Sequence, residues 1–330
     1  MTECVVSHLM NDAMTIALGL VVAALAIVSV LALFSLAADR RTVARVPPLG
    51  HFMDIEGARI HCLDRGRGPP IVMVHGLGGQ LRNFSYSLLD KLVDRYRVIL
   101  IDRPGSGHSR RAPGAESSLA SHAAVVAAVI ARLGLERPLV MGHSLGGAIG
   151  LRLALDHPDS VGALALIAPL TNVQSKIPAA FSSLFIRSDW MRFAISNTIA
   201  TPLAMLFGEQ GRAMVFAPEP VPDDFAVKGG GLLVRRPAVF ASASADISDI
   251  NEQVAAMLPR YSSLRLPVDI LFGRDDAILD PAVNGESLRA LLPSLRLTLC
   301  EGGHMLPITQ PQLVSDWLDT VYARKPNAID

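Results

Sequence analysis

The chain has 330 residues, half of them hydrophobic, and it carries 30 basic and 30 acidic side chains. This length is enough to bury a large core, in one big domain or two small ones. The balanced charge argues against nucleic acid as a partner, because phosphate binding needs a concentrated positive field.

The first element along the chain is an uncharged apolar run from Thr15 to Ala38. A helix of this length is about 36 Å long, which is enough to cross a hydrocarbon core of about 30 Å. A cleaved signal peptide fits less well, because no basic residue precedes the run and the run is long for that purpose. We therefore expect an N-terminal tail (residues 1–14), a transmembrane helix (15–38) and a linker (39–49).

Basic residues follow the apolar run, whereas none precedes it. They are Arg40, Arg41 and Arg45. Short loops rich in Lys and Arg tend to stay on the cytoplasmic side of a membrane. The sequence therefore predicts a single-pass membrane protein whose larger, C-terminal part lies on the cytoplasmic side.

From residue 50 onward, strand-like and helix-like patterns alternate. Strands are expected at residues 52–55, 59–63, 71–75, 98–102, 139–142, 163–167, 268–272 and 295–299. Helices are expected at residues 79–94, 117–133, 144–156, 281–292 and 310–323. This alternation implies a mostly parallel sheet with helices on both faces. The first two strands have no helix between them, so we expect an antiparallel hairpin at the sheet edge.

Residues 171–267 interrupt the alternation within the domain that we expect over residues 50–330. They contain apolar helical patches such as "FSSLFIRSDWMRFAI" and "PLAMLF". A structureless loop of this length is implausible in a compact domain. We therefore predict a helical insertion over one end of the sheet, which either packs as ordinary structure or forms a lid over a pocket.

A serine flanked by glycines occupies the turn between an expected strand and an expected helix. The sequence Gly142-His143-Ser144-Leu145-Gly146 fits G-x-S-x-G, after the strand "PLVMG" and at the start of "SLGGAIGLRLALDH". This strand–turn–helix context is typical of a nucleophile elbow, in which the serine hydroxyl is exposed at the carboxyl edge of the sheet. The alternative is a glycine-rich turn with an incidental serine.

A serine nucleophile needs a base, and the base needs a group that orients it. The late segment "CEGGHMLPITQP" offers His304 after the last expected strand. The segment "VDILFGRDDAILDP" offers Asp275, Asp276 and Asp280 after the strand before it. The resulting chain order is Ser, Asp, His, as in the α/β-hydrolases.

These motifs resemble the α/β-hydrolase family, in particular its lid-bearing esterases, lipases and carbon–carbon-bond hydrolases. The resemblance covers residues 49–323 and is carried by "VMVHGLGG", "DRPGSGHS", "GHSLGG", "GRDD" and "GGHMLP". It implies that the acid lies three positions after the glycine that ends the strand, which gives Asp276. Asp275 is the alternative, and Asp280 is expected to cap the helix that begins at Pro281. The other family position for the acid, after "LALIAPL", holds no carboxylate.

The oxyanion formed during acyl transfer needs fixed hydrogen-bond donors. The backbone N–H of Leu145, at the start of the helix, is one candidate. The resemblance implies the N–H of Leu77, in "HGLGG", as the other. We expect His75 and His143 to hold the site's loops rather than to transfer protons.

Other chemistries have little support in the sequence. It has neither a complete dinucleotide-binding fingerprint nor a P-loop, and its histidines have no compact metal-ligand spacing, so we expect no cofactor and no metal. The three cysteines (Cys4, Cys62 and Cys300) are too few and too scattered for a disulfide framework. In relatives that open epoxides or remove halides the nucleophile is an aspartate, so Ser144 argues against both reactions.

The sequence thus predicts a membrane-anchored serine hydrolase that cleaves an apolar carboxylic ester through an acyl-enzyme intermediate. Its predicted partners are a small apolar ester and, through the N-terminal helix, a membrane. The same resemblance also covers carbon–carbon-bond hydrolases, acyltransferases and cofactor-free perhydrolases. A non-catalytic binding protein on this fold is the alternative from another class.

Overall fold

The computed structural model describes residues 2–292 and 294–325, and it is organised around one mixed sheet. The strand order is β1-β2-β4-β3-β6-β7-β8-β9, with β5 paired to β2. The strands are β1 (His51–Ile55), β2 (Ala58–Arg65), β3 (Pro70–Val74), β4 (Arg97–Ile101), β5 (Arg110–Arg111), β6 (Leu139–His143), β7 (Ala163–Ile167), β8 (Val268–Gly273) and β9 (Leu295–Cys300).

Strand directions follow the predicted pattern. The path from β4 to β9 is parallel throughout, whereas β2 pairs antiparallel with β1, β4 and β5. The edge hairpin β1–β2 is confirmed, and the two-residue strand β5 was not predicted. The central strands β6, β7 and β8 are buried along their whole length, which requires cover on both faces of the sheet.

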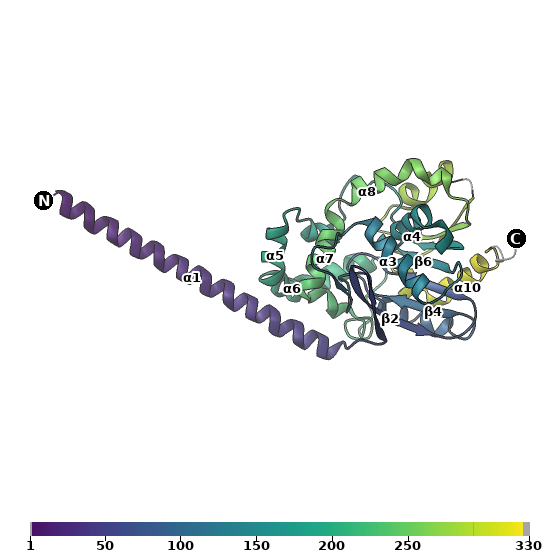
Figure 1. The fold of residues 1–330 in the computed structure, drawn as a ribbon, viewed down its shortest axis with the longest axis horizontal. Helices are drawn as coiled ribbons and strands as arrows, with labels where there is room; N and C mark the ends of the chain where they lie inside the picture. The colour runs from purple at the N-terminus through teal and green to yellow at the C-terminus, as the bar shows by residue number, and fades with distance from the viewer. Residues whose placement is uncertain (1, 293, 326–330) are drawn as a thin grey trace.

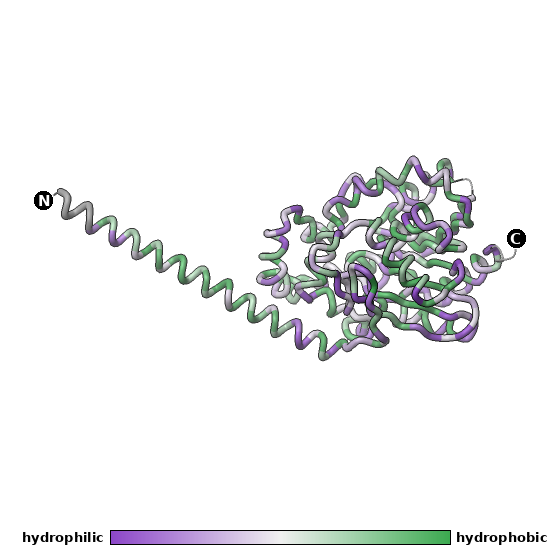
Figure 2. The backbone as a smooth tube through the Cα atoms, in the orientation of Figure 1, coloured by the Kyte–Doolittle hydropathy of each residue, from purple (hydrophilic) through white to green (hydrophobic). Residues whose placement is uncertain are grey.

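Helices supply that cover (Figure 1). Outside the segment between β7 and β8, the α-helices of the domain are α2 (Arg82–Ser85), α3 (Leu119–Arg132), α4 (Leu145–Asp156), α9 (Leu306–Thr309) and α10 (Pro311–Tyr322), and a short 3-10 helix (Pro158–Ser160) follows α4. The helix α3 packs against α4, and α10 packs against β7. The resulting apolar interior is visible in Figure 2, where the strands are mostly hydrophobic. The predicted fold, a mostly parallel sheet surrounded by helices, is confirmed.

The helix predicted over residues 79–94 is wrong as a continuous element. The segment contains only α2 and a short 3-10 helix (Leu89–Lys91), joined by turns. Side chains take the backbone donors at its start: Gln80 N donates to Asn83 Oδ1, and Arg82 N donates to Gln80 Oε1. Such local side-chain acceptors compete with the helical hydrogen bonds. The apolar spacing reflected burial of this segment rather than a regular helix.

The helix predicted over residues 281–292 is also irregular. A π-helical turn (Ala282–Glu286) is followed by a short 3-10 helix (Ser287–Ala290). Thr171 Oγ1 donates to the carbonyl oxygen of Asn284 over 2.7 Å, which diverts this carbonyl from the regular pattern. Asp280 Oδ1 accepts from Ala282 N over 2.8 Å, as expected for a residue that caps the start of this helix.

Residues between β7 and β8 form a helical segment, of which α5, α6 and α7 lie at one end of the domain and α8 runs along its top in this view (Figure 1). Its helices are a 3-10 helix (Ala179–Leu184), α5 (Asp189–Asn197), α6 (Ala200–Phe216), a 3-10 helix (Gly231–Arg235), α7 (Pro237–Ser248), α8 (Ile250–Met257) and a 3-10 helix (Leu258–Ser263). Their helical character agrees with the expectation for residues 171–267.

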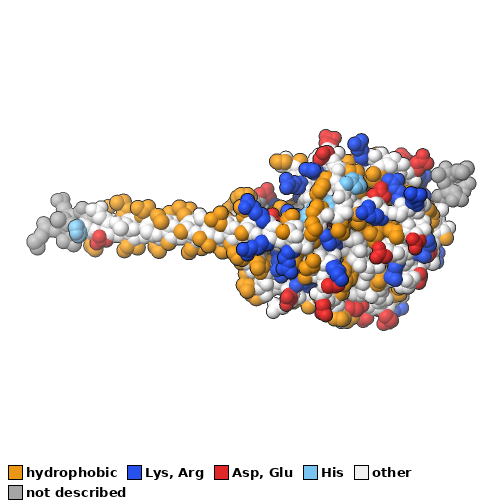
Figure 3. Space-filling view, turned by 90° about the horizontal axis from the view of Figure 1, so that it is seen from below, with side chains coloured by type: hydrophobic (Ala, Val, Ile, Leu, Met, Phe, Trp, Pro, Cys, Tyr) orange, Lys and Arg blue, Asp and Glu red, His pale blue; other side chains and the backbone are white. Residues whose placement is uncertain are grey.

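The N-terminal helix α1 runs from Thr2 to Arg45. It therefore continues through the predicted tail and into the predicted linker, and it ends at Arg45, just before Pro47 and Pro48, which a helix interior does not tolerate. Its residues 8–45 form the one helix, in the part of the chain that the structure describes, that is long and apolar enough to cross a membrane. Hydrophobic side chains cover α1 outside the domain, and basic side chains gather where it meets the domain (Figure 3).

The end of α1 is fixed to the helical segment between β7 and β8. Ser35 Oγ donates to the carbonyl oxygen of Thr198 over 2.9 Å, and Asp39 pairs with Arg236 over 2.7 Å. Val46, just after the helix, is fully buried against Leu232 and its neighbours. This anchoring places α1 beside the helices that border the candidate site.

Candidate functional site

Ser144 lies at a sharp turn between β6 and α4. Its backbone angles are φ 56° and ψ −120°, in a region that costs a non-glycine residue about 1–3 kcal/mol. The turn is held in place because Ser144 N donates to the carbonyl oxygen of Ile167 and Leu170 N donates to that of Ser144, each over 3.0 Å. A Cβ atom on Gly142 or Gly146 would collide with neighbouring backbone. The two glycines of the motif are therefore required by close packing, as the sequence indicated.

The loop after β3 lies directly against Ser144. A Cβ atom on Gly76 would lie 2.8 Å from Ser144 Cβ, so only glycine fits there. Leu77 follows, and Leu77, Ser144 and Leu145 line one cavity. Among residues 2–292 and 294–325, no acceptor is recorded for the backbone N–H of Leu77 or of Leu145. Both predicted donors are thus beside Ser144 and available to a bound group.

The side chain of Arg103 is hydrogen-bonded to the backbone of this loop. Its Nε donates to the carbonyl oxygen of His75 over 3.1 Å, and its Nη2 donates to that of Gly76 over 3.0 Å. Its Nη1 pairs with Asp246 on α7 over 2.7 Å, and both side chains are 1% exposed. Burial alone would raise the pKa of Asp246, but the nearby charges of Arg103, His122 and Arg111 hold that pKa well below its usual range.

His304 and Asp276 meet at the carboxyl edge of the sheet. His304 Nδ1 and Asp276 Oδ2 are 2.8 Å apart, and the two side chains are 2% and 0% exposed. Asp276 Oδ1 accepts from the N–H groups of Ile278 and Leu279, so this carboxylate is fixed on both oxygens. Asp275 is exposed and makes no such contact with His304. The structure therefore brings Asp276, and not the alternative Asp275, to the histidine.

Two buried histidines brace the loops around these groups. His143 Nε2 donates to the carbonyl oxygen of His304 over 2.9 Å, and burial lowers the pKa of His143 to about 3. His75 accepts from Arg103 N at its Nε2, and burial lowers its pKa to about 3 as well. Both rings stay neutral at neutral pH and hold backbone groups, which agrees with the structural roles expected for them.

Two contacts of the site had no recognised signal in the sequence. Glu219, in the helical segment, accepts from Gly303 N with both carboxylate oxygens, next to His304. Asp246 lies 143 positions from its partner Arg103. The motif "DRPGSGHS" pointed to the neighbourhood of Arg103, but no local pattern marks either carboxylate. Long-range pairs of this kind become visible only in the fold.

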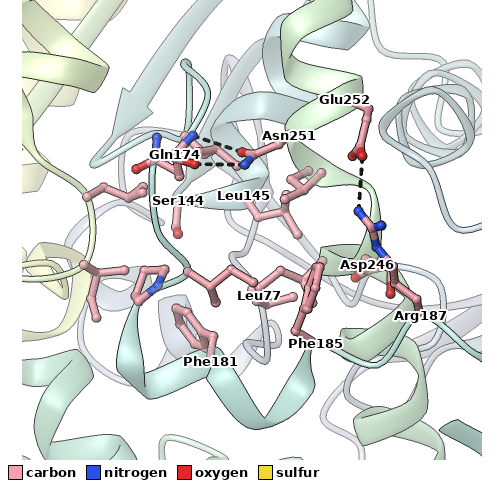
Figure 4. Close-up of a pocket in the computed structure, with 18 residues that line it drawn as sticks. Leu77, Ser144, Leu145, Gln174, Phe181, Phe185, Arg187, Asp246, Asn251 and Glu252 are labelled. Atoms are coloured by element: carbon pink, nitrogen blue, oxygen red, sulfur yellow. Dashed lines mark hydrogen bonds and ion pairs between the residues drawn. The ribbon is translucent and has the colours of Figure 1, made fainter. Parts of the chain in front are cut away.

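Two cavities meet at Leu77 and Ser144. The smaller one, of about 180 Å³, is shown in Figure 4, with Phe181 and Phe185 across from Ser144. The larger one, of about 650 Å³, is lined by mostly apolar side chains and also by His304. Ser144 and His304 thus face one space, although no hydrogen bond between their side chains is recorded within the described ranges. Those ranges also contain no cluster of three or more His, Cys, Asp or Glu side chains that could hold a metal ion.

The chain is similar to a protein family and to several known proteins. Residues 69–311 match the family model of the α/β hydrolase fold. The chain is 29% identical over 252 residues to RutD of Escherichia coli, a provisionally named carbamate hydrolase. This match spans 74% of the present chain and 87% of RutD. A bacterial membrane phospholipase A superposes with a TM-score of 0.66 at 24% identity, over 96% of this chain and 99% of its own.

A further relative matches only in part. It is the dihydrolipoyllysine-residue acetyltransferase component of the acetoin cleaving system of Cupriavidus necator, 39% identical over 121 residues. This match spans 36% of the present chain and about a third (32%) of the length of that relative. The family match covers most of the chain, so the chain belongs to the α/β hydrolase fold family. The name of the relative RutD, a carbamate hydrolase, supports a hydrolase.

The low pKa of His143 predicts how stability depends on pH. Above about pH 6.5 a histidine is neutral in both states, but below it the unfolded chain binds a proton that folded His143 does not bind until about pH 3. The free energy of unfolding should therefore fall with decreasing pH by up to about 1.4 kcal/mol per pH unit for this residue.

His143→Gln keeps an N–H donor for the carbonyl of His304 but removes this titration. Denaturant unfolding in detergent, followed between about pH 6.5 and 4, should show a shallower pH slope than the wild type. His51→Gln, at an exposed histidine, is the matched control. Equal slopes in the His143→Gln and wild-type chains would contradict the prediction.

Proposed function

We propose that the chain is a membrane-anchored serine hydrolase that cleaves an apolar carboxylic ester. The Asp276–His304 pair, with its atoms 2.8 Å apart beside a cavity that Ser144 also lines, is the observation that carries this proposal. In the proposed triad Ser144 is the nucleophile, His304 is the base and Asp276 orients the imidazole. Because the Nδ1–H of His304 donates to Asp276, the Nε2 of His304 carries no proton and can accept the one from the Ser144 hydroxyl.

In acylation, Ser144 Oγ forms a bond to the ester carbonyl carbon while His304 accepts the hydroxyl proton. The π electrons of the carbonyl move to its oxygen, which accepts hydrogen bonds from Leu77 N–H and Leu145 N–H. The C–O bond to the alcohol then breaks, and His304 returns its proton to the leaving oxygen. The product of this half-reaction is an acyl-enzyme at Ser144.

Water completes the reaction by the same route in reverse. It adds to the acyl carbon while His304 takes one of its protons, and the oxyanion forms again between Leu77 and Leu145. The bond to Ser144 Oγ breaks, the serine recovers its proton from His304, and the carboxylic acid leaves. One ester and one water thus give one acid and one alcohol.

The two cavities suggest how the ester lies. The larger cavity is within the usual range of small-molecule sites, about 300–1,000 Å³, and its apolar lining includes Leu203, Phe207 and Phe216. The smaller cavity is also lined mostly by apolar side chains, and the Asn251 side chain in its wall accepts a hydrogen bond from Gln174 N–H and donates one to the Gln174 carbonyl oxygen. A long apolar acyl chain in the larger cavity and a smaller apolar alcohol in the smaller one fit these volumes and linings.

Membrane anchoring by α1 is the second part of the proposal. The exposed apolar side chains of α1 outside the domain have no protein partner in the described ranges, and a bilayer would cover them. Arg40, Arg41 and Arg45 follow the apolar run, which favours a cytoplasmic position for the hydrolase domain. The helical segment between β7 and β8 would then act as a lid beside the membrane.

The orienting acid can be tested with a neighbouring aspartate as control. Asp276→Asn keeps the size of the side chain but removes the charge that fixes the tautomer of His304, so kcat should fall by about 10⁴ for a p-nitrophenyl ester. Asp275→Asn, at the exposed neighbour, should retain kcat within about twofold. Loss of activity in the second variant and not in the first would assign the acid to Asp275.

The acyl-chain pocket can be tested at a glycine of α6. Gly211 lines the larger cavity, and nothing lies within 4 Å of a Cβ atom placed there. Gly211→Phe should lower kcat/KM for long acyl chains by about tenfold or more while changing it little for acetate esters, because the ring fills cavity volume. Gly211→Ala is the matched control. An unchanged chain-length profile in Gly211→Phe would place the acyl chain elsewhere.

A further inference from the structure

The neighbouring helices α5 and α6, in the helical segment between β7 and β8, expose large apolar side chains on their outer surface. On α5, Trp190 and Phe193 are 74% and 70% exposed, and on α6 Leu206 is 72% exposed. Met191 and Met205 beside them are also exposed. Large exposed apolar side chains on two helices that pack against each other are typical of a contact with another protein or with lipid. We call these five side chains the α5–α6 face.

The α5–α6 face lies next to α1. Thr198, at the corner between α5 and α6, accepts a hydrogen bond from Ser35 in the apolar run of α1, and α1 packs against both helices. Figure 1 shows α5 and α6 on the side of the domain toward which α1 extends. Ser35 precedes Asp39, the first charged residue after the run, by about 6 Å along the helix axis. The corner is therefore level with the last turn of the apolar run.

The charges that border the face are paired within their own helices. Asp189 pairs with Arg192 over 2.6 Å on α5, and Glu209 lies 3.9 Å from Arg212 on α6. Helices that lie in a membrane interface combine an apolar face with a charged rim, and they enter the lipid by about 5–10 Å. Thr198, at the corner between α5 and α6, is level with the last turn of the apolar run of α1. If that run spans the bilayer, the corner lies at this depth in the membrane interface.

The larger cavity reaches the same surface. Ile199, Leu203 and Phe207 line it, and they are also 41%, 45% and 55% exposed. None of the five side chains of the α5–α6 face lines the cavity itself. The apolar lining that leads to Ser144 is thus continuous with the apolar outer surface next to α1.

We propose that the α5–α6 face inserts into the lipid leaflet beside α1, so that the larger cavity takes its apolar substrate directly from the bilayer. The occupant is lipid rather than protein, because the face continues the apolar surface of the membrane-spanning helix. The substrate route rests on the proposed function, whereas insertion of the face does not depend on catalysis.

Insertion can be measured with a native reporter in the full chain. Trp190 and Trp317 are the two tryptophans, and Trp317 is buried in α10. In the Trp317→Phe chain, reconstituted into phosphatidylcholine vesicles, lipids brominated in the upper acyl chain should quench Trp190 emission by at least about twofold. The Trp190→Phe chain is the control, and its remaining Trp317 should be quenched little. If the Trp317→Phe chain does not fold, the quenching of Trp190 is obtained by subtracting the quenching of the Trp190→Phe chain from that of the wild type.

Absence of quenching in chains that remain bound to the vesicles would overturn the proposal. Unquenched Trp190 together with cross-linking between Phe193→Cys chains would identify a second copy as the occupant, which also overturns it. Both readouts are independent of hydrolysis, so they remain decisive if the wild-type chain cleaves no ester.

The substrate route needs a comparison of two substrates. Leu206→Glu should lower hydrolysis of a long-chain ester embedded in vesicles by about tenfold, because a carboxylate disfavours insertion. It should change hydrolysis of a soluble short-chain ester less than about twofold, because Leu206 does not line the cavity. Leu291→Glu, at an exposed leucine between β8 and β9, is the matched control. Equal vesicle activities in the two variants would overturn the route, whereas no wild-type activity on either ester would instead contradict the proposed function.

Discussion

The strained turn at Ser144 is the constraint on which the rest of the site depends. A φ of 56° at a serine persists only when the surroundings leave no alternative. The surroundings here are closely packed glycine backbones, a hydrogen bond from Ser144 N–H to β7, and one from Leu170 N–H to the carbonyl oxygen of Ser144. The turn sits in the middle of a parallel sheet whose central strands are fully buried, so relaxing it would disturb the core. The same turn directs the hydroxyl away from the sheet and starts α4 beside it.

The helical segment between β7 and β8 is hydrogen-bonded both to the candidate site and to α1. Asp246 holds Arg103, which in turn holds the carbonyls before Leu77, and Glu219 holds the N–H before His304. Because the Arg103–Asp246 pair is buried, removing Asp246 would leave the charge of Arg103 without a counter-ion in the interior, at a typical cost of about 3–5 kcal/mol. Ser35 and Thr198 connect the same segment to the N-terminal helix. The helical segment is thus joined by hydrogen bonds and an ion pair to the loops of the site and to the N-terminal helix.

Much of this arrangement could be predicted from local patterns in the sequence. Apolar runs bounded by turns marked eight of the nine strands in the described residues, and the glycines spaced around Ser144 made the serine turn recognisable. The spacing after β8 ranked Asp276 first, and its contact with His304 agrees with that choice. The errors lie where side chains override periodicity, as with Gln80 and Asn83, which break the helix expected over residues 79–94. The roles of Asp246 and Glu219 depend on partners 143 and 84 positions away, which no local pattern encodes.

The central claim is that Ser144 is an activated nucleophile, and labelling by a fluorophosphonate tests it most directly. The full chain in detergent would be treated with the probe, digested, and mapped by mass spectrometry. A single modified peptide carrying the probe on Ser144, with no labelling after denaturation or in Ser144→Ala, is the predicted result, because only a serine activated by a base and an oxyanion site reacts readily. A folded chain that leaves Ser144 unmodified, or one labelled elsewhere, would contradict the claim.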